Sequence, residues 1–263
     1  MNQVNFVSPK SQNERLFPSF NQLIKHMKSS DDSFPIMEDG KAILSIRFDD
    51  NGKPVREVVR RSNYRQSYQL FSTKMNKTMS CESSIEFKGC YIMETNPLIK
   101  KYHMQPAVIS YEINQEKHQH IPDALIELNS DKKCFIEFKP QQDLDDVELQ
   151  LRTDLIRKHL PAYGYGYLVV CGNQVEGVDL INAKKLSHIE RTRVSDGTLC
   201  EIRNILKQCQ SISIQSLIER LKLVKNLRNI LYQLMRQGIL GYSVDIDEVI
   251  TDETQIFWEG KMQ

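Results

Sequence analysis

Two carboxylates and an amine stand at a spacing that suits the hydrolysis of a phosphodiester. Asp123 follows Pro122, and the run Glu137-Phe138-Lys139 begins fourteen residues after Asp123. A hard cation such as Mg²⁺ takes oxygen ligands from one or two carboxylates and keeps several waters. Such a cation polarises a phosphoryl oxygen and activates the attacking water, while a nearby ammonium offsets the charge that develops. These residue types therefore indicate a metal-dependent hydrolase.

The expected roles follow from the chemistry of each group. Asp123 and Glu137 are predicted to bind Mg²⁺, or Mn²⁺ as its substitute, with the main-chain carbonyl of Phe138 as a further oxygen ligand. Lys139 is predicted to position the attacking water or to offset charge on the phosphorane. A plain amphipathic hairpin, with a surface aspartate and a cross-strand pair of glutamate and lysine, is the alternative. The apolar residues around Glu137 favour a buried strand that carries a site.

A β-hairpin is expected to position these groups. Segments 120–128 and 133–139 have the composition of strands, and the polar turn formers between them connect the two. If residue 128 pairs with residue 133, Asp123 lies opposite the residue between the glutamate and the lysine, which become its diagonal neighbours. The glutamate and the lysine are two residues apart and share one face. The hairpin would thus gather the three groups at one end of a sheet.

Two histidines precede Asp123 on the first strand of this hairpin. His118 and His120 are two residues apart and therefore share a face near the aspartate. Contact with a DNA phosphate, or an exposed edge position, is expected of them rather than metal ligation.

A third carboxylate could come from a helix upstream. Residues 81–94 have helical character, with Glu86, Cys90 and Met93 on one face. A helix placed before the first strand would bring Glu86 over the sheet end, as a metal ligand or an orienter of water. Glu82 shares the face one turn earlier and is the second candidate. Acidic residues near a helix start are also favoured by the helix dipole, so a purely structural role stays open.

Four motifs occur in a fixed order: Cys81-Glu82-Ser83-Ser84-Ile85-Glu86, Tyr102-His103-Met104-Gln105-Pro106, Pro122-Asp123 and Glu137-Phe138-Lys139. Together they resemble the TnsA-type endonuclease, the restriction-endonuclease-like subunit of heteromeric cut-and-paste transposases, over residues 45–175. The resemblance implies that Glu86, Asp123, Glu137 and Lys139 are catalytic. Some members carry glutamine where this chain has Glu137, and Ser84 stands where a larger apolar residue is common.

The resemblance also implies a reaction and its partners. The chain would nick the 5′ ends of a transposon, with double-stranded DNA at the transposon ends as substrate. An integrase-type transposase subunit would cut and join the 3′ ends, and an ATP-dependent regulator would be a further partner. Two alternatives stay open: a stand-alone restriction or repair nuclease of the same fold, and a catalytically inactive nuclease-like winged-helix adaptor that binds DNA and a regulator protein.

A basic stretch precedes the helix that carries Glu86. From Lys53 to Lys77 the chain has seven basic residues against one acidic residue, Glu57, whereas the whole chain carries a net charge of only +1. Contact with DNA phosphates is therefore expected to be local. A solvated loop face is the alternative. The residues predicted to contact DNA here are Arg56, Arg60, Arg61, Arg65, Lys74 and Lys77.

The order of elements predicts an α/β fold of the α+β type with a mixed sheet, as in restriction endonucleases. A strand at 108–113 precedes the hairpin, and a helix at 144–160 and a buried strand at 167–171 follow it. The predicted organisation is an N-terminal extension (1–45), a restriction-endonuclease-like catalytic domain (46–190) and a small winged-helix domain (195–263).

The C-terminal segment reads as three short helices followed by two strands. A capping box at Thr198 would open the first helix. The third helix shows Arg228, Tyr232 and Arg236 on one predicted outer face, which are side-chain types that read a major groove. The loop between the two strands is acidic and would repel DNA, so docking of a protein is the alternative. Its acidic residues are Asp245, Asp247, Glu248, Asp252 and Glu253.

Composition and cysteine usage predict a cytoplasmic protein. The chain is 40% hydrophobic and 26% charged, as in ordinary globular proteins. It has no long apolar run and no secretory leader, so no membrane partner is expected. The six cysteines show neither a C-x-x-C pair nor zinc-ligand spacing, which is typical of reduced thiols.

Overall fold

The computed structural model describes residues 20, 22, 24, 37, 38, 41–48, 67–190, 192–244 and 248–260. Contacts divide the chain into two compact units. Residues 22–94 and 98–176 form one, and residues 177–263 are the main part of the other. No helix within the described residues is both long and apolar enough to cross a membrane.

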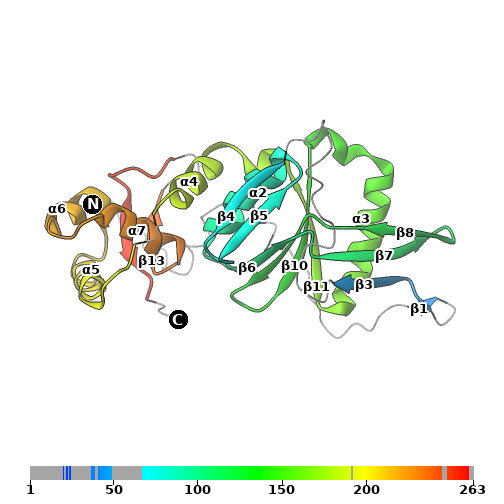
Figure 1. Cartoon of the computed structure of the whole chain (residues 1–263), viewed down its shortest axis with the longest axis horizontal. Coiled ribbons are helices and arrows are strands. Elements are labelled where there is room, and N and C mark those ends of the chain that lie inside the picture. Colours follow the sequence, from blue (N-terminus) through cyan, green and yellow to red (C-terminus); the bar gives the residue numbers. More distant parts are fainter. Residues whose placement is uncertain are drawn as a thin grey trace, which may run out of the picture. The chain divides into compact units, whose positions relative to one another are not determined.

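A four-stranded mixed sheet forms the centre of the first unit (Figure 1). Its strands are β6 (Ile99–Met104), β9 (Ala124–Leu128), β10 (Lys133–Lys139) and β11 (Tyr165–Cys171), in the order β11-β10-β9-β6. The β10–β11 pair is parallel and the other two pairs are antiparallel. The predicted α+β class with a mixed sheet is confirmed.

The strand predicted at 108–113 exists as β7 (Ala107–Ile113), but it belongs to a separate sheet. It pairs there with β3 (Leu44–Phe48) and β8 (Glu116–His120). The chain leaves the central sheet at Gln105, whose φ of 46° is left-handed, and Pro106 follows. The unpredicted strand β6 takes the edge position beside β9. Its polar residues and a bulge after Ile99 hide the alternation that identifies a strand.

The predicted hairpin of β9 and β10 exists, with a register one residue tighter than expected. Lys133 lies opposite Glu127 rather than residue 128, because the loop holds only three residues, 129–131. Asp131 ends this loop with a φ of 61°, the left-handed position typical of three-residue hairpin loops. The ladder ends at the pair of Ala124 and Ile136, and the same register continued by one residue places Asp123 opposite Glu137. The correction matters because opposite residues share a face, so both carboxylates now point the same way.

Two helices cover the central sheet. On one face lies α2 (Ser84–Thr95), and it packs so closely that a Cβ on Gly89 would meet the Phe138 ring at 2.3 Å. Its predicted buried stripe is confirmed, since Cys90 and Met93 are fully buried. The other face packs against α3 (Val147–His159), where Ile156 joins the core that contains Phe135, Leu160 and Tyr167. The same core includes Ile109 and Tyr111 of β7.

The remaining short elements of this unit flank the sheet. A second hairpin precedes α2 and consists of β4 (Tyr68–Ser72) and β5 (Lys77–Cys81). Three 3₁₀ turns, at Gln141–Asp145, Leu160–Tyr163 and Gly172–Val175, surround α3 and β11. A two-stranded ribbon is formed by β1 (Met37–Glu38) and β2 (Lys41–Ala42). The helix predicted at 144–160 is thus α3 with a 3₁₀ turn at each end.

The second unit contains the predicted C-terminal elements in the predicted order. They are α5 (Asp196–Cys209), β12 (Ile212–Ser213), α6 (Ile214–Arg220), α7 (Leu227–Arg236), β13 (Leu240–Ser243) and β14 (Gln255–Trp258), with sheet order β12-β14-β13. The assignment as a winged helix stays a prediction. The capping box at Thr198 is wrong: the N-cap of α5 is Ser195, whose Oγ accepts from the Thr198 N–H at 3.1 Å.

A further helix, α4 (Gly177–Ser187), goes with this second unit. The side chain of Asn182 donates to the carbonyl of Glu248 at 3.1 Å and accepts from the N–H of Ile250 at 2.8 Å. The boundary by contacts therefore lies at Gly177, whereas the sequence placed it between 190 and 195. At the other end, the expected boundary at residue 46 falls inside β3.

Candidate active site

Asp123 immediately precedes β9, and two main-chain hydrogen bonds hold it there. Its Oδ2 accepts from the N–H of Phe138 at 2.7 Å, and its carbonyl accepts from the N–H of Gln105 at 2.8 Å. Burial raises the pKa of Asp123 well above its usual range, and the charges of Glu137 and Glu86 raise this pKa further. The three carboxylates are thus close enough to repel one another, as the sequence predicted.

Glu137, in the middle of this group, is only 2% exposed and is surrounded by basic side chains. Its Oε1 lies 2.8 Å from Lys139 Nζ and 3.3 Å from Arg152 Nη2, and its Oε2 lies 2.9 Å from His120 Nε2. Burial is the largest single effect and raises the pKa of Glu137. The neighbouring His120 and Lys139 together outweigh burial, so this pKa ends below its usual value. Glu137 is therefore held in its ionised form.

Glu86 has the structural role that the sequence left open, and its role as a metal ligand or orienter of water stays a prediction. Ser83 Oγ accepts from the Glu86 N–H at 3.2 Å, and Glu86 Oε2 accepts from the Glu82 N–H at 3.0 Å, so both residues cap the start of α2. Burial is the largest effect and raises the pKa of Glu86. Hydrogen bonds from the Glu82 N–H and the Ser83 side chain lower this pKa, and the charges of Glu82 and Glu137 raise it further. Glu86 therefore caps α2 and also places its carboxylate close enough to Glu137 for the two charges to repel each other.

The donor set suits a hard divalent cation. No hydrogen bond to Asp123 Oδ1 is found among the described residues, and half-buried Asp123 lies close to the buried carboxylates of Glu86 and Glu137, a repulsion that a cation would relieve. Within residues 67–190, however, no three His, Cys, Asp or Glu side chains are arranged as a ready metal site. Glu137 is instead paired with the cations of Lys139 and Arg152.

Sequence reasoning missed the surroundings of Glu137. His120 was expected at an exposed edge or on DNA, but it is buried, and its Nε2 also lies 3.0 Å from the Tyr167 hydroxyl. Arg152 was not considered at all. A signal for it does exist: it is three residues after Leu149 and four before Ile156, both on the buried face of α3, so it lies beside that face.

The predicted DNA contacts of the basic stretch have different outcomes. Lys74 does not present a free cation in this structure, because its Nζ donates to the carbonyls of Met93 at 2.9 Å and Ile99 at 2.8 Å. This side chain closes the end of α2. Lys77 begins β5 and is half-buried. The other four predicted residues, Arg56, Arg60, Arg61 and Arg65, lie outside the described part of the chain.

The outer face predicted for α7 is wrong for two of its three residues. Tyr232 is 5% exposed and Arg236 is 7% exposed, so neither side chain is presented on an open surface. Arg228 is exposed, but it makes a two-pronged ion pair with Asp252, with Nε–Oδ1 at 3.1 Å and Nη2–Oδ2 at 2.6 Å. One acidic residue of the predicted wing is thereby neutralised. Among the other wing acids, Asp245 and Asp247 lie outside the described residues.

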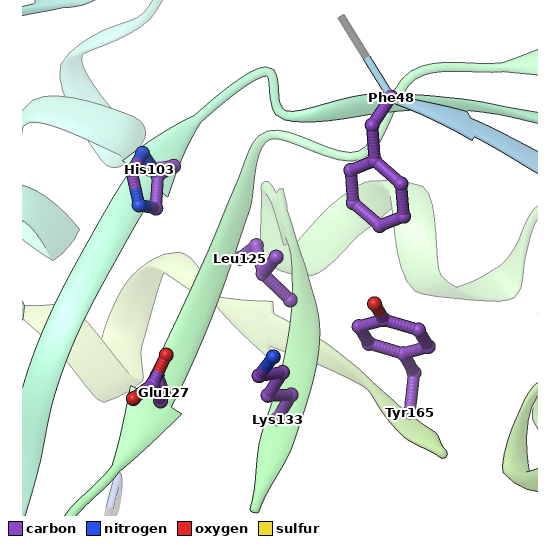
Figure 2. Close-up of a pocket in the computed structure, with 6 residues that line it drawn as sticks. All are labelled: Phe48, His103, Leu125, Glu127, Lys133 and Tyr165. Atoms are coloured by element: carbon purple, nitrogen blue, oxygen red, sulfur yellow. The ribbon is translucent and has the colours of Figure 1, made fainter. Parts of the chain in front are cut away.

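A cavity of about 220 Å³ lies on the face of the central sheet that also carries Glu137 (Figure 2). Figure 2 shows the aromatic rings of Phe48 and Tyr165 on one side of it and His103 on the other. Lys133 begins β10 four residues before Glu137, so the cavity lies toward the opposite end of that strand. None of the predicted catalytic residues lines it. Its remaining lining residues are Leu125 and Glu127.

Comparisons with known proteins agree with the chemistry of the site. Residues 96–171 match the family model described as TnsA-like endonuclease N terminal. No curated protein matches the chain. A crystal structure of protein VC1899 from Vibrio cholerae is similar at 14% identity over 34% of this chain and 23% of that chain, with a TM-score of 0.25. A score this low carries no argument about fold.

The family match covers all four strands of the central sheet and three of the four predicted catalytic residues: Asp123, Glu137 and Lys139. Glu86 precedes the matched segment. The match therefore places three of the four predicted catalytic residues in a segment that is similar to a nuclease family. Residues 96–171 of this chain are thus similar to the family described as TnsA-like endonuclease N terminal.

Proposed function

We propose that this chain is the metal-dependent DNA endonuclease subunit of a heteromeric transposase, and that it nicks the 5′ ends of the transposon by hydrolysis. The observation that carries the proposal is the cluster of Glu86, Asp123 and Glu137 beside Lys139, inside or next to the family match. Buried acids that repel one another are unfavourable unless a cation joins them, and such sites are typical of function.

Asp123, Glu137, the carbonyl of Phe138 and Glu86 would hold Mg²⁺, or Mn²⁺ in its place. The ion, when bound, supplies Lewis-acid polarisation of the phosphoryl oxygen and a more acidic water. The protein contributes position. The N–H of Phe138 fixes Asp123, and the cap of α2 fixes Glu86. The ammonium of Lys139 is 2.8 Å from Glu137 and can donate to the water or to a phosphate oxygen.

The proposal is tested by the isosteric variant Asp123→Asn. The amide oxygen can still accept from the Phe138 N–H, so the fold should persist while the charge is lost. We expect loss of nicking on transposon-end DNA with the partner transposase and Mg²⁺ present, and loss of Mn²⁺ binding in calorimetry. Unchanged nicking by this variant would exclude the assignment. Efficient cutting of naked DNA by the wild-type chain alone would favour the stand-alone nuclease, and absent metal binding would favour the inactive adaptor.

For the C-terminal unit, protein docking is the better-supported proposal. Tyr232 and Arg236 are buried, and the cation of Arg228 is paired with Asp252, so α7 offers few free groups to a phosphate backbone. An ATP-dependent regulator or the transposase subunit would be the partner. Removal of residues 195–263 should then weaken pull-down of the partner protein more than it weakens binding to transposon-end DNA. If the truncation weakens DNA binding more than it weakens pull-down of the partner, the C-terminal unit acts mainly on DNA.

A further inference from the structure

The guanidinium edge of Arg152 formed by Nε and Nη2 lies beside Glu137 and makes fewer hydrogen bonds than it can donate. On this edge, Nη2 lies 3.3 Å from Glu137 Oε1, while the neighbouring Nε is buried without a hydrogen-bond partner in the described structure. The guanidinium also interacts with the side chain of Tyr111. The same edge of Arg228 contacts both oxygens of Asp252. A buried donor without an acceptor is unfavourable, so the arrangement lacks one acceptor beside Glu137.

The position of Arg152 is fixed by its helix. Asp146 caps α3, with Oδ1 accepting from the N–H groups of Glu148 at 2.8 Å and Leu149 at 3.2 Å. Leu149 and Ile156 anchor the helix in the core. The guanidinium is therefore presented from a rigid element rather than a loop. Its side chain is 21% exposed although Nε is buried, so solvent reaches only part of the guanidinium and its charge is only partly screened.

Two cations compete for one oxygen of Glu137. Lys139 Nζ and Arg152 Nη2 both approach Oε1, at 2.8 Å and 3.3 Å. If Glu137 bound a divalent cation, its ion pairs with Lys139 and Arg152 would weaken. In the proposed reaction the other anion at this place is the phosphodiester. A planar guanidinium fork fits two phosphate oxygens, whereas an ammonium acts as a single point charge.

We infer that Arg152 is a catalytic residue that binds the scissile phosphate, donating from Nε and Nη2 to its non-bridging oxygens. These oxygens gain charge as the oxygen of water bonds to phosphorus and the bond from phosphorus to the leaving oxygen breaks, so the contact strengthens in the transition state. The inference rests on the proposed endonuclease function. It differs from a structural role, in which Arg152 would only neutralise buried Glu137.

The two roles predict different results for Arg152→Gln. As a phosphate ligand, Arg152 should be needed for nicking but not for metal binding. We expect nicking of transposon-end DNA to slow on the order of 100-fold, the usual loss for one such donor. Mn²⁺ affinity, measured by calorimetry on the free protein, should stay equal or increase, because a positive charge leaves the site. Arg152→Lys should recover only part of the rate, since it restores charge without the fork.

Arg157→Gln is the matched control, because Arg157 lies on the same helix and its Nε donates to the Tyr167 carbonyl at 3.4 Å, away from Glu137. It should nick at the wild-type rate. A second measurement uses Ca²⁺, to suppress cleavage, and duplexes that carry either a phosphate or a neutral methylphosphonate at the nicking position. The wild-type protein should prefer the phosphate, and Arg152→Gln should lose this preference.

Three outcomes would overturn the inference. They are wild-type nicking by Arg152→Gln, parallel losses of nicking and Mn²⁺ affinity, and an unchanged preference for the charged phosphate. Failure of the proposed function is recognised separately, because Asp123→Asn would then keep both nicking and metal binding. If Asp123→Asn is inactive while Arg152→Gln resembles the wild type, only the role of Arg152 is refuted.

Discussion

Glu94 offers the sharpest test of how the catalytic helix is held. This residue of α2 is 1% exposed, and at least five hydrogen bonds reach its two oxygens. Oε1 accepts from Thr73 N at 2.9 Å, Thr73 Oγ1 at 2.7 Å and Lys74 N at 3.3 Å. Oε2 accepts from Ser72 Oγ at 2.6 Å and the Tyr102 hydroxyl at 3.1 Å. One carboxylate thus joins the β4–β5 turn and β6 to the helix that carries Glu86.

The magnitude follows from the charge of the acceptor. Hydrogen bonds to an ionised group contribute about 1.5–3 kcal/mol each, against about 1 kcal/mol for neutral pairs. Glu94→Gln preserves the shape but removes the charge, so five bonds that each weaken by roughly 0.5–1 kcal/mol give a loss of about 2.5–5 kcal/mol. Glu94→Ala would also leave buried donors unpaired and should cost more than Glu94→Gln. The hydroxyl of Tyr102 stays protonated as a donor, because burial raises its pKa.

Urea unfolding at pH 7 measures this loss as a lower midpoint at an unchanged slope. The matched control is Glu176→Gln, which removes the exposed ion pair between Lys88 and Glu176. An exposed pair of this kind contributes about 0–1 kcal/mol, so the control should unfold almost like the wild type. If Glu94→Gln unfolds at the same urea concentration as Glu176→Gln, the buried carboxylate does not hold the helix and the reasoning is refuted.

Two further predictions concern the acidic cluster and the C-terminal unit. In EDTA, Asp123→Asn should stabilise the protein at pH 8 more than at pH 5. Folding raises the pKa of the Asp123 carboxyl, so this group binds more protons in the folded state than in the unfolded state. Its contribution to stability therefore falls as the pH rises from the pKa of the unfolded state through the pKa of the folded state. If Asp123→Asn changes the urea midpoint by the same amount at pH 5 and pH 8, this expectation is contradicted. Tyr232→Ala should lower the free energy of unfolding by about 3 kcal/mol, because it empties a buried aromatic position. Calorimetry or urea unfolding checks this loss. Unchanged stability together with weaker DNA binding would instead support the prediction that Tyr232 lies on an exposed face of α7.

The sequence by itself determined which chemistry the chain carries. The spacing of Asp123, Glu137 and Lys139 identified the hairpin and its acids, because side-chain types and alternation are local properties. The buried stripe of α2 and the order of the C-terminal elements were also predictable, since amphipathic periodicity survives without knowledge of the neighbours. The family match over residues 96–171 supports this local chemistry.

Only the tertiary structure decided which groups meet. The left-handed backbone at Asp131 shortened the hairpin loop by one residue and placed both strand carboxylates on one face. Distant segments supplied the partners of Glu137, with His120 coming from β8 and Arg152 from α3. Burial likewise gave Lys74 a role inside the fold. Such contacts depend on packing between elements far apart in the chain, and no local pattern encodes them, because a charged side chain looks the same in sequence whether it faces solvent or a buried carboxylate.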